Sequence, residues 1–344
     1  MKTLISVLIF LTITLSSFSQ TVKEVDARLF SIVSDKGDTI RFLKTDTSII
    51  QKKPTIIFCQ GSLPIPLIID IGVKKFIPAL NNFNYKKLSE KYNLIVISMP
   101  HTPVIVAKEK LNNQYQYVPN LNQEYKFDAL YLRDNYLEKY VERANCVIKY
   151  LKTRKWVDKN GISVFGHSQG SYIALKLAEQ NPSIRAVGYS GGNPSGRFTL
   201  NIRKQRRDVI SKKITPTEGQ KNINEYYKVW KNYCKGIDPE VGNADRAKTW
   251  TSFTFPLWDE LIHLKTPIFI TYGTEDLESS EGCELLPIYF EKAGKTNYTM
   301  MPMVGCGHNF EEITSEGASN YDKMHWDDVM NSFVEWLEKQ QIKK

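Results

Sequence analysis

The residue with the clearest chemical potential is Ser168, at the centre of the stretch Gly-His-Ser-Gln-Gly over residues 166–170. An apolar run over 162–165 precedes it and helix-forming residues with one apolar face follow it, which predicts a strand, a sharp turn and a helix. The flanking glycines have a steric reason, because so tight a turn leaves no room for neighbouring side chains. The strained turn would present the Ser168 hydroxyl beside a helix N-terminus, where negative charge is favoured. This is the pattern of an activated nucleophile; the alternative is an ordinary glycine-rich turn.

With this strand, turn and helix, the sequence resembles the α/β-hydrolase superfamily from about residue 27 to the C-terminus. The resemblance implies a mostly parallel, eight-stranded sheet flanked by helices. It also implies a nucleophile, an acid and a base in the order serine, acid, histidine, which differs from the orders in chymotrypsin and subtilisin.

The resemblance assigns the acid and the base to loops after two late strands. A strand over 267–272 ends in Gly-Thr-Glu-Asp, which places the acid at Asp276, with the adjacent Glu275 as its competitor. The last strand, over 298–304, is followed by a glycine-rich loop that carries His308, the expected base. The alternative for His308 is a structural role in that loop.

These residues together predict acyl transfer. A serine hydroxyl is a weak nucleophile at neutral pH, so Ser168 needs His308 to accept its proton, and Asp276 would orient the imidazole. Backbone N–H groups would stabilise the oxyanion, one from Gln169 and one from the loop after the strand that ends at Cys59. In that loop Gln60 stands where the superfamily usually has histidine. We assign the second donor to Ser62, with Leu63 next; Gly61 could also be a plain turn glycine.

The substrate class remains open at this stage. Residues 266–310 resemble the dienelactone hydrolase and prolyl-oligopeptidase-like branch, through the Gly-Thr-x-Asp loop, a helix ending in Lys-Ala-Gly, and the Gly-x-Gly-His loop. The resemblance leaves esters, thioesters, lactones and short peptides open as substrates, and implies no metal or organic cofactor. We favour an esterase, with a serine peptidase as the runner-up. A non-catalytic binding protein on the same fold is the alternative from another class.

Several elements are predicted around these loops. Residues 29–34 and 39–43 read as a hairpin, and short apolar runs over 55–59, 93–99 and 185–189 read as further strands. Apolar residues at helical spacing over 137–151 and 326–337 predict helices that pack on the sheet.

Two segments depart from this alternation. Residues 102–133 are polar and rich in tyrosine, which predicts a long loop beside which His101 could contact substrate, although a plain loop histidine is the usual case. Residues 197–264 contain aromatic-rich helical segments, and the resemblance predicts a helical lid there. The alternative is that the aromatic side chains only attach this insertion to the main domain. A basic cluster over 202–213 is either a solvated face or a site for an anionic substrate group.

The N-terminus predicts export. Residues 1–20 contain Lys2, an apolar run too short to span a bilayer, and small residues up to Gln20, the layout of a secretory signal peptide. An uncleaved anchor is the alternative. We therefore expect a signal peptide over 1–20 and one hydrolase domain over 21–344, periplasmic or secreted, without stable membrane insertion after cleavage.

Charge and cysteine content add two expectations. The formal net charge is +9, and losing Lys2 makes it +8, a balance that we read as solubility rather than nucleic-acid binding. Five cysteines are few for a secreted chain and odd in number, which argues against a disulfide scaffold. A bridge between Cys283 and Cys306 would restrain the acid and base loops, and two unrelated thiols are the alternative.

Overall fold

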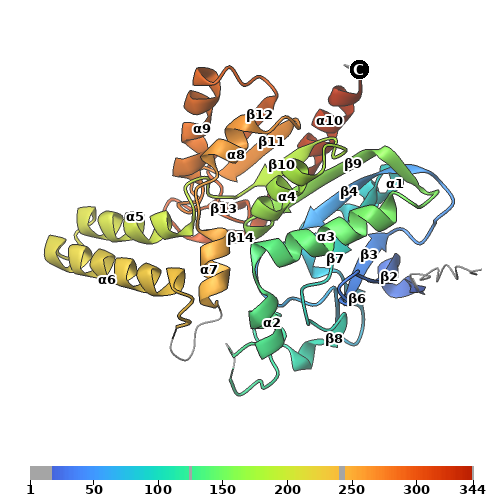
Figure 1. Ribbon diagram of the computed structural model, residues 1–344, viewed down its shortest axis with the longest axis horizontal. Helices are drawn as coiled ribbons and strands as arrows, with labels where there is room; N and C mark the ends of the chain where they lie inside the picture. Colours follow the sequence, from blue (N-terminus) through green and yellow to red (C-terminus); the bar gives the residue numbers. More distant parts are fainter. Residues whose placement is uncertain (1–17, 124–125, 240–244, 343–344) are drawn as a thin grey trace, which may run out of the picture.

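A nine-stranded sheet forms the centre of the protein in the computed structural model, which describes residues 18–123, 126–239 and 245–342 (Figure 1). Its strands, in spatial order, are β1 (Phe18–Val22), β2 (Ala27–Val33), β3 (Thr39–Thr45), β7 (Asn93–Ile97), β4 (Lys53–Cys59), β9 (Val157–His167), β10 (Val187–Ser190), β11 (Ile268–Gly273) and β12 (Tyr298–Met303). The pairs from β7 to β12 are parallel, and those from β1 to β7 are antiparallel. The prediction of a mostly parallel sheet is confirmed.

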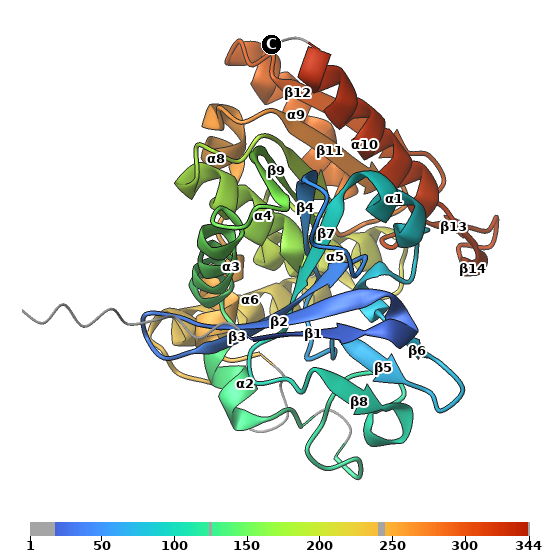
Figure 2. The ribbon, with the colours of Figure 1, turned by 90° about the vertical axis from the view of Figure 1, so that its right-hand side faces the viewer.

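Helices cover both faces of this sheet (Figure 2). The helices are α1 (Tyr85–Lys91), α2 (Ala129–Asp134), α3 (Leu137–Leu151), α4 (Gln169–Gln180), α5 (Arg197–Ile210), α6 (Pro216–Cys234), α7 (Ala247–Phe253), α8 (Trp258–His263), α9 (Ser280–Lys292) and α10 (Trp326–Ile342). Helices α3, α4, α8 and α9 pack on one face, and α1 and α10 on the other. In β4, Ile57 faces α3 and α4 while Ile56 and Phe58 face α10, which explains why central strands are continuous apolar runs.

The sheet has nine strands, where the resemblance predicted eight, and the additional strand is β1. Strand β1 pairs along β2, and four of its five side chains are exposed, so the segment lacks the apolar alternation that marks a strand in a sequence. The predicted signal peptide overlaps it at Phe18–Gln20, and residues 1–17 lie outside the described residues. No described helix is long and apolar enough to cross a bilayer.

Several short elements lie between the long strands and helices. A small sheet joins β5 (Ile68–Asp70), β6 (Lys75–Phe76) and β8 (Ile105–Ala107), and β13 (Glu311–Ile313) pairs with β14 (Ser319–Met324). Single turns of 3₁₀ helix occur at Lys23–Val25, Pro78–Leu80 and Lys108–Lys110. The expected long loop over 102–133 therefore contains β8, a 3₁₀ turn and α2.

The insertion between β10 and β11 is helical, as expected. It comprises α5, α6, α7 and α8, and α5 and α6 form an antiparallel pair that projects from the body at the left of Figure 1. Helix α6 begins with Pro216 at its first position, and a reciprocal capping box between Thr215 and Glu218 satisfies its first N–H groups. We call residues 197–237 the arm.

Candidate active site

The nucleophile turn forms where β9 meets α4. Ser168 has φ 56° and ψ −125°, a strained conformation for a residue with a side chain. A Cβ on Gly166 would overlap the carbonyl oxygen of Gly170, and a Cβ on Gly170 would overlap that of Cys59. Both glycines are therefore required by close backbone contacts, and α4 starts at Gln169 directly behind the serine.

Two further loops at the carboxyl edge of the sheet bring His308 and Asp276 to this serine. His308 Nε2 lies 3.0 Å from Ser168 Oγ, and His308 Nδ1 lies 2.7 Å from Asp276 Oδ2. The acid loop follows β11 and the base loop follows β12. They pack against each other closely, because a Cβ on Gly273 would overlap carbonyl oxygens of the base loop. The structure thus brings the three sequence-predicted residues into one hydrogen-bonded chain.

The carboxylate that reaches His308 is that of Asp276. It also accepts the Ser279 hydroxyl and, at 2.9 Å, the backbone N–H of Glu278. The neighbouring Glu275 is exposed, and its carboxylate lies 3.4 Å from the Thr274 hydroxyl.

The contact between Asp276 and His308 shifts the pKa of both residues. Burial opposes ionisation of Asp276, but the hydrogen bond and charge of His308, with the Ser279 and Glu278 donors, lower the pKa of Asp276 below its ordinary value. Burial likewise disfavours the imidazolium of His308, but hydrogen bonding to Asp276 and its charge raise the pKa of His308 above 6.5. This environment stabilises a cationic His308 beside an ionised Asp276.

The ring of His167 packs against the ring of His308. His167 is buried, its ring centroid lies 5.0 Å from that of His308, and its Nδ1 is 3.0 Å from Ser190 Oγ. Burial, and next the proximity of His308, lower the pKa of His167 to about 3. His167 is therefore a neutral neighbour that packs beneath His308. This contact could not be predicted from the sequence, where His167 is only one position of the nucleophile turn.

The loop expected to supply the second oxyanion donor lies against the nucleophile. A Cβ on Gly61 would sit 3.8 Å from Ser168 Cβ, so Ser62 follows a residue that borders the serine. Gln60 donates from Nε2 to the carbonyl of Ile97 at 3.0 Å, which ties this loop to the end of β7. That contact gives a structural reason for glutamine at a position where the resemblance expected histidine.

The structure adds a further residue that the sequence did not reveal. Arg197, the first residue of α5, donates from Nη2 to Gln169 Oε1 at 2.6 Å and from Nη1 to Asp245 Oδ2 at 3.1 Å. Its guanidinium also lies over the Phe253 ring, 5.1 Å from the centroid. The root of the helical insertion is thus bonded to the residue after the nucleophile. Arg197 and Gln169 are 28 positions apart, and no sequence pattern links them.

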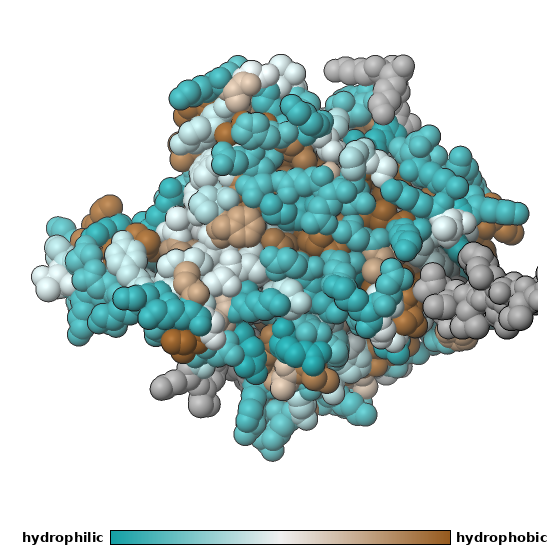
Figure 3. All heavy atoms as spheres, viewed as in Figure 1, coloured by the Kyte–Doolittle hydropathy of each residue, from teal (hydrophilic) through white to brown (hydrophobic). Residues whose placement is uncertain are grey.

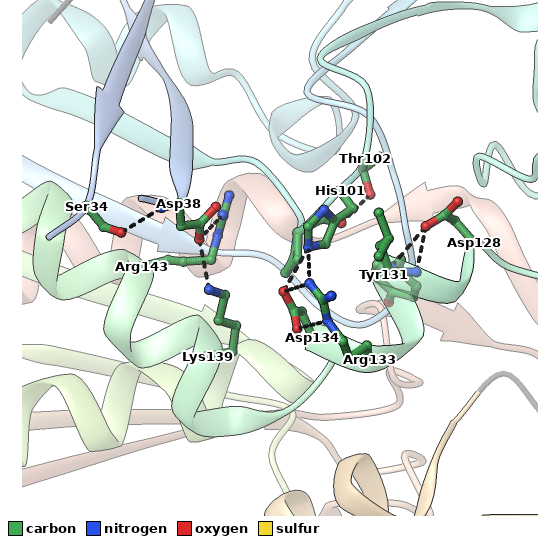
Figure 4. A network of polar contacts seen from close by, with 12 residues as sticks. Ser34, Asp38, His101, Thr102, Asp128, Tyr131, Arg133, Asp134, Lys139 and Arg143 are labelled. Atoms are coloured by element: carbon green, nitrogen blue, oxygen red, sulfur yellow. Dashed lines mark hydrogen bonds and ion pairs between the residues drawn. The ribbon is translucent and has the colours of Figure 1, made fainter. Parts of the chain in front are cut away.

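His101 takes part in a different cluster. Figure 4 shows it turned toward Asp134 on α2, with His101 Nε2 2.8 Å from Asp134 Oδ2 and Arg133 bonded to the same carboxylate. The hydrogen bond from Arg133, and next that from His101, lower the pKa of Asp134 to about 2. The cluster holds α2 against the loop after β7, so His101 has a structural contact there.

The cysteines are unpaired thiols. The Cys283 thiol donates to the carbonyl of Gly192 at 3.4 Å, while that of Cys306 points to the carbonyl of Val304. All five cysteines fall within the described residues, and none is in a disulfide. The possible bridge between Cys283 and Cys306 is therefore not formed, and the acid and base loops are held by backbone packing instead.

Comparison with known proteins identifies the fold. Neither a protein-family model nor a curated sequence matches the chain. Among solved structures, the α/β hydrolase GrgF from Penicillium sp. sh18 is similar with a TM-score of 0.53 at 13% identity, over 91% of this chain and 98% of that chain. Est1E from Butyrivibrio proteoclasticus gives 0.52 at 16% identity, over 92% of this chain and 99% of that chain. An acylaminoacyl peptidase from Pyrococcus horikoshii gives 0.50 at 14% identity, over 96% of this chain but 42% of that chain.

The protein therefore has the α/β-hydrolase fold, as the sequence motifs predicted. At 13–16% sequence identity, the similarity to these structures is one of fold.

Proposed function

We propose that this protein is an exported serine hydrolase that cleaves a carboxylic ester through an acyl-enzyme intermediate. The observation that supports this most directly is the continuous path of hydrogen bonds from Asp276 through His308 to Ser168, at 2.7 and 3.0 Å. Ser168 stands on a strained turn at the helix N-terminus, with its hydroxyl within reach of a base. This is the geometry that acyl transfer by a serine requires.

In the first half of the reaction Ser168 Oγ attacks the ester carbonyl carbon while His308 Nε2 accepts its proton. Asp276 holds the Nδ1–H tautomer and stabilises the imidazolium as it forms. The backbone N–H groups of Gln169 and Ser62 are the proposed donors to the carbonyl oxygen as it gains negative charge. Removal of one such donor typically raises the barrier by about 3 kcal/mol.

In the second half His308 returns the proton to the departing alcohol, and the acyl group remains on Ser168. Water then attacks the acyl-enzyme with His308 again as base, which releases the acid and restores the serine. These steps need protein groups and water alone. An ester is favoured over an amide because alkoxides leave more readily than amines, and a short peptide is the alternative substrate.

Two further features belong to the proposal. Residues 1–20 are proposed to direct export and to be removed. The helices over 197–264 are proposed to cover the site. Arg197 at their root bonds to Gln169, and Phe198 contacts Trp230 and Trp250, with ring centroids 4.8 and 5.7 Å apart. Such an aromatic cover would exclude water from the acyl-enzyme and contact an apolar acyl group.

The test is a comparison of matched nitrophenyl esters with aminoacyl and dipeptidyl nitroanilides. We expect ester cleavage, and we expect Ser168→Ala to lose at least about 10⁴-fold in kcat/KM. The control is Ser183→Ala, which changes an exposed serine at the opposite edge of the sheet and should keep full activity. Each variant is checked by its melting temperature.

Other outcomes change the assignment. Cleavage of the amides with efficiency equal to that of the esters would replace the esterase with a peptidase. Failure of a fluorophosphonate probe to label Ser168 in the folded protein would contradict a serine nucleophile altogether, and would favour a binding protein on this fold.

A further inference from the structure

The arm carries almost the whole net charge of the protein. Residues 197–237 contain eleven Lys and Arg against three Asp and Glu, a net charge of +8, whereas the entire chain has +9. The rest of the chain is therefore nearly neutral. Because the arm projects from the body (Figure 1), this charge is concentrated on one protruding element.

Part of this charge is compensated by acidic side chains. Arg203 and Arg207 both reach Glu281 on α9, which holds the arm to the main domain. Lys228 pairs with Glu225 within α6.

Other lysines of the arm face solvent. Five exposed lysines make no ion pair within the described part of the chain: Lys204, Lys212, Lys221, Lys231 and Lys235. Their charges are free to meet an external anion.

Apolar side chains are exposed among these lysines. Ile210 is 81% exposed at the end of α5, next to Lys212, and Tyr227 is 53% exposed on α6. Val229 and Ile237 are exposed as well. In Figure 3 brown apolar atoms stand among teal ones on the arm. On a projecting cationic element, such side chains are accessible to an apolar phase outside the protein.

We propose that the arm binds the surface of an anionic lipid bilayer. Lipid headgroups supply the negative charge that the free lysines lack, and each lysine close to such a surface strengthens binding by about fivefold. Ile210 and Tyr227 can enter the boundary between headgroups and acyl chains, as apolar residues of interfacial helices do. A nucleic acid would satisfy the lysines, but its phosphate backbone offers no apolar environment for Ile210. This inference does not depend on the proposed catalysis.

The experiment is flotation of the purified protein with phosphatidylcholine vesicles, with and without phosphatidylglycerol, at low ionic strength. We expect binding only to the vesicles that contain phosphatidylglycerol, with loss of binding as salt is added. The triple variant Lys204→Gln, Lys221→Gln, Lys231→Gln should weaken binding at least tenfold. Ile210→Ser should weaken it by several-fold at unchanged charge, which a purely ionic contact would not show.

A matched control removes three exposed lysines from the body. Lys86→Gln, Lys87→Gln, Lys159→Gln changes the net charge equally and should bind as the unaltered protein does. Equal weakening by both triple variants would overturn the proposal in favour of a diffuse charge effect. Binding to duplex DNA but not to anionic vesicles would overturn it in favour of a nucleic-acid surface. Retention of melting temperature in every variant excludes misfolding as the cause.

Discussion

The contact between Asp276 and His308 decides at which pH the site can act. His308 must be neutral to accept the proton of Ser168, and its hydrogen bond to Asp276 raises the pKa of His308 above 6.5 despite burial. Activity on esters should therefore rise with pH through this raised pKa. The acid limb of kcat/KM reports that pKa in the free protein.

Asp276→Asn should lower both the rate and the midpoint of this limb. Without the carboxylate, the imidazolium loses its partner, so the pKa of His308 falls and the limb moves to lower pH. The amide also stabilises the wrong tautomer, and kcat/KM should fall by about 10⁴-fold. The measurement is kcat/KM for one nitrophenyl ester across pH.

The neighbouring carboxylate provides the control. Glu275→Gln removes an exposed charge one position away. It should change kcat/KM by no more than about twofold and the midpoint of the acid limb by no more than a few tenths of a pH unit. A larger effect at Glu275 than at Asp276 would reverse the assignment of the acid.

At the scale of elements, the nucleophile turn depends on how closely α4 approaches β4. The backbone of Gly170 lies against the carbonyl oxygen of Cys59, the last residue of β4, so the first turn of α4 sits directly on the neighbouring strand. A side chain there would push the helix and the strand apart. The turn is thus supported by contacts between elements as well as by its own backbone.

Gly170→Ala should therefore lower the free energy of unfolding by about 3 kcal/mol or more, because the methyl group meets backbone that cannot yield. Gly61→Ala is the matched control, since its methyl group would meet nothing closer than 3.8 Å and Gly61 does not have the positive φ that excludes side chains. Urea unfolding of the two variants makes the comparison. Equal stabilities would contradict the tight approach of α4 to β4.

The length of an element determines whether it can be predicted from the sequence. Long apolar strands and amphipathic helices have a period that can be read, so β4, β9, α3 and α10 were predicted with their loops, and with these loops the positions of Ser168, Asp276 and His308. Strands of two or three residues, such as β5 and β6, are too short to show a period. Strand β1 pairs through its backbone while its side chains face solvent. Arg197 and Gln169 meet through side chains far apart in sequence, and His167 acts by packing; neither contact leaves a pattern.

At the scale of the whole molecule, stability should depend on pH through His167. Its pKa is about 3 in the folded protein, below the ordinary 6.5, so the unfolded chain binds a proton first as the pH falls. This contribution to stability is present above pH 6.5 and is lost as the pH falls toward 3, by at most about 1.4 kcal/mol per pH unit. His167→Asn should make the free energy of unfolding less steeply dependent on pH between about pH 6 and 4.

His325 should behave with the opposite sign. Its hydrogen bond to Asp328, with Nδ1 2.8 Å from Oδ2, raises the pKa of His325, so its contribution is present below pH 6.5 and is lost as the pH rises through the raised pKa. Guanidinium unfolding of His167→Asn and His325→Gln across pH tests both signs. An unchanged acid slope in His167→Asn would show that this histidine is already protonated in the folded state.

The arm finally determines how the molecule turns in an electric field. With a net charge of +8 on residues 197–237 and +9 on the entire chain, the centre of positive charge is displaced from the centre of mass. This excess charge gives the arm the character of a positive pole, on which an electric field exerts a torque as well as a force. Near a negatively charged surface we expect the torque to favour arm-first orientations before contact, over distances set by the Debye length.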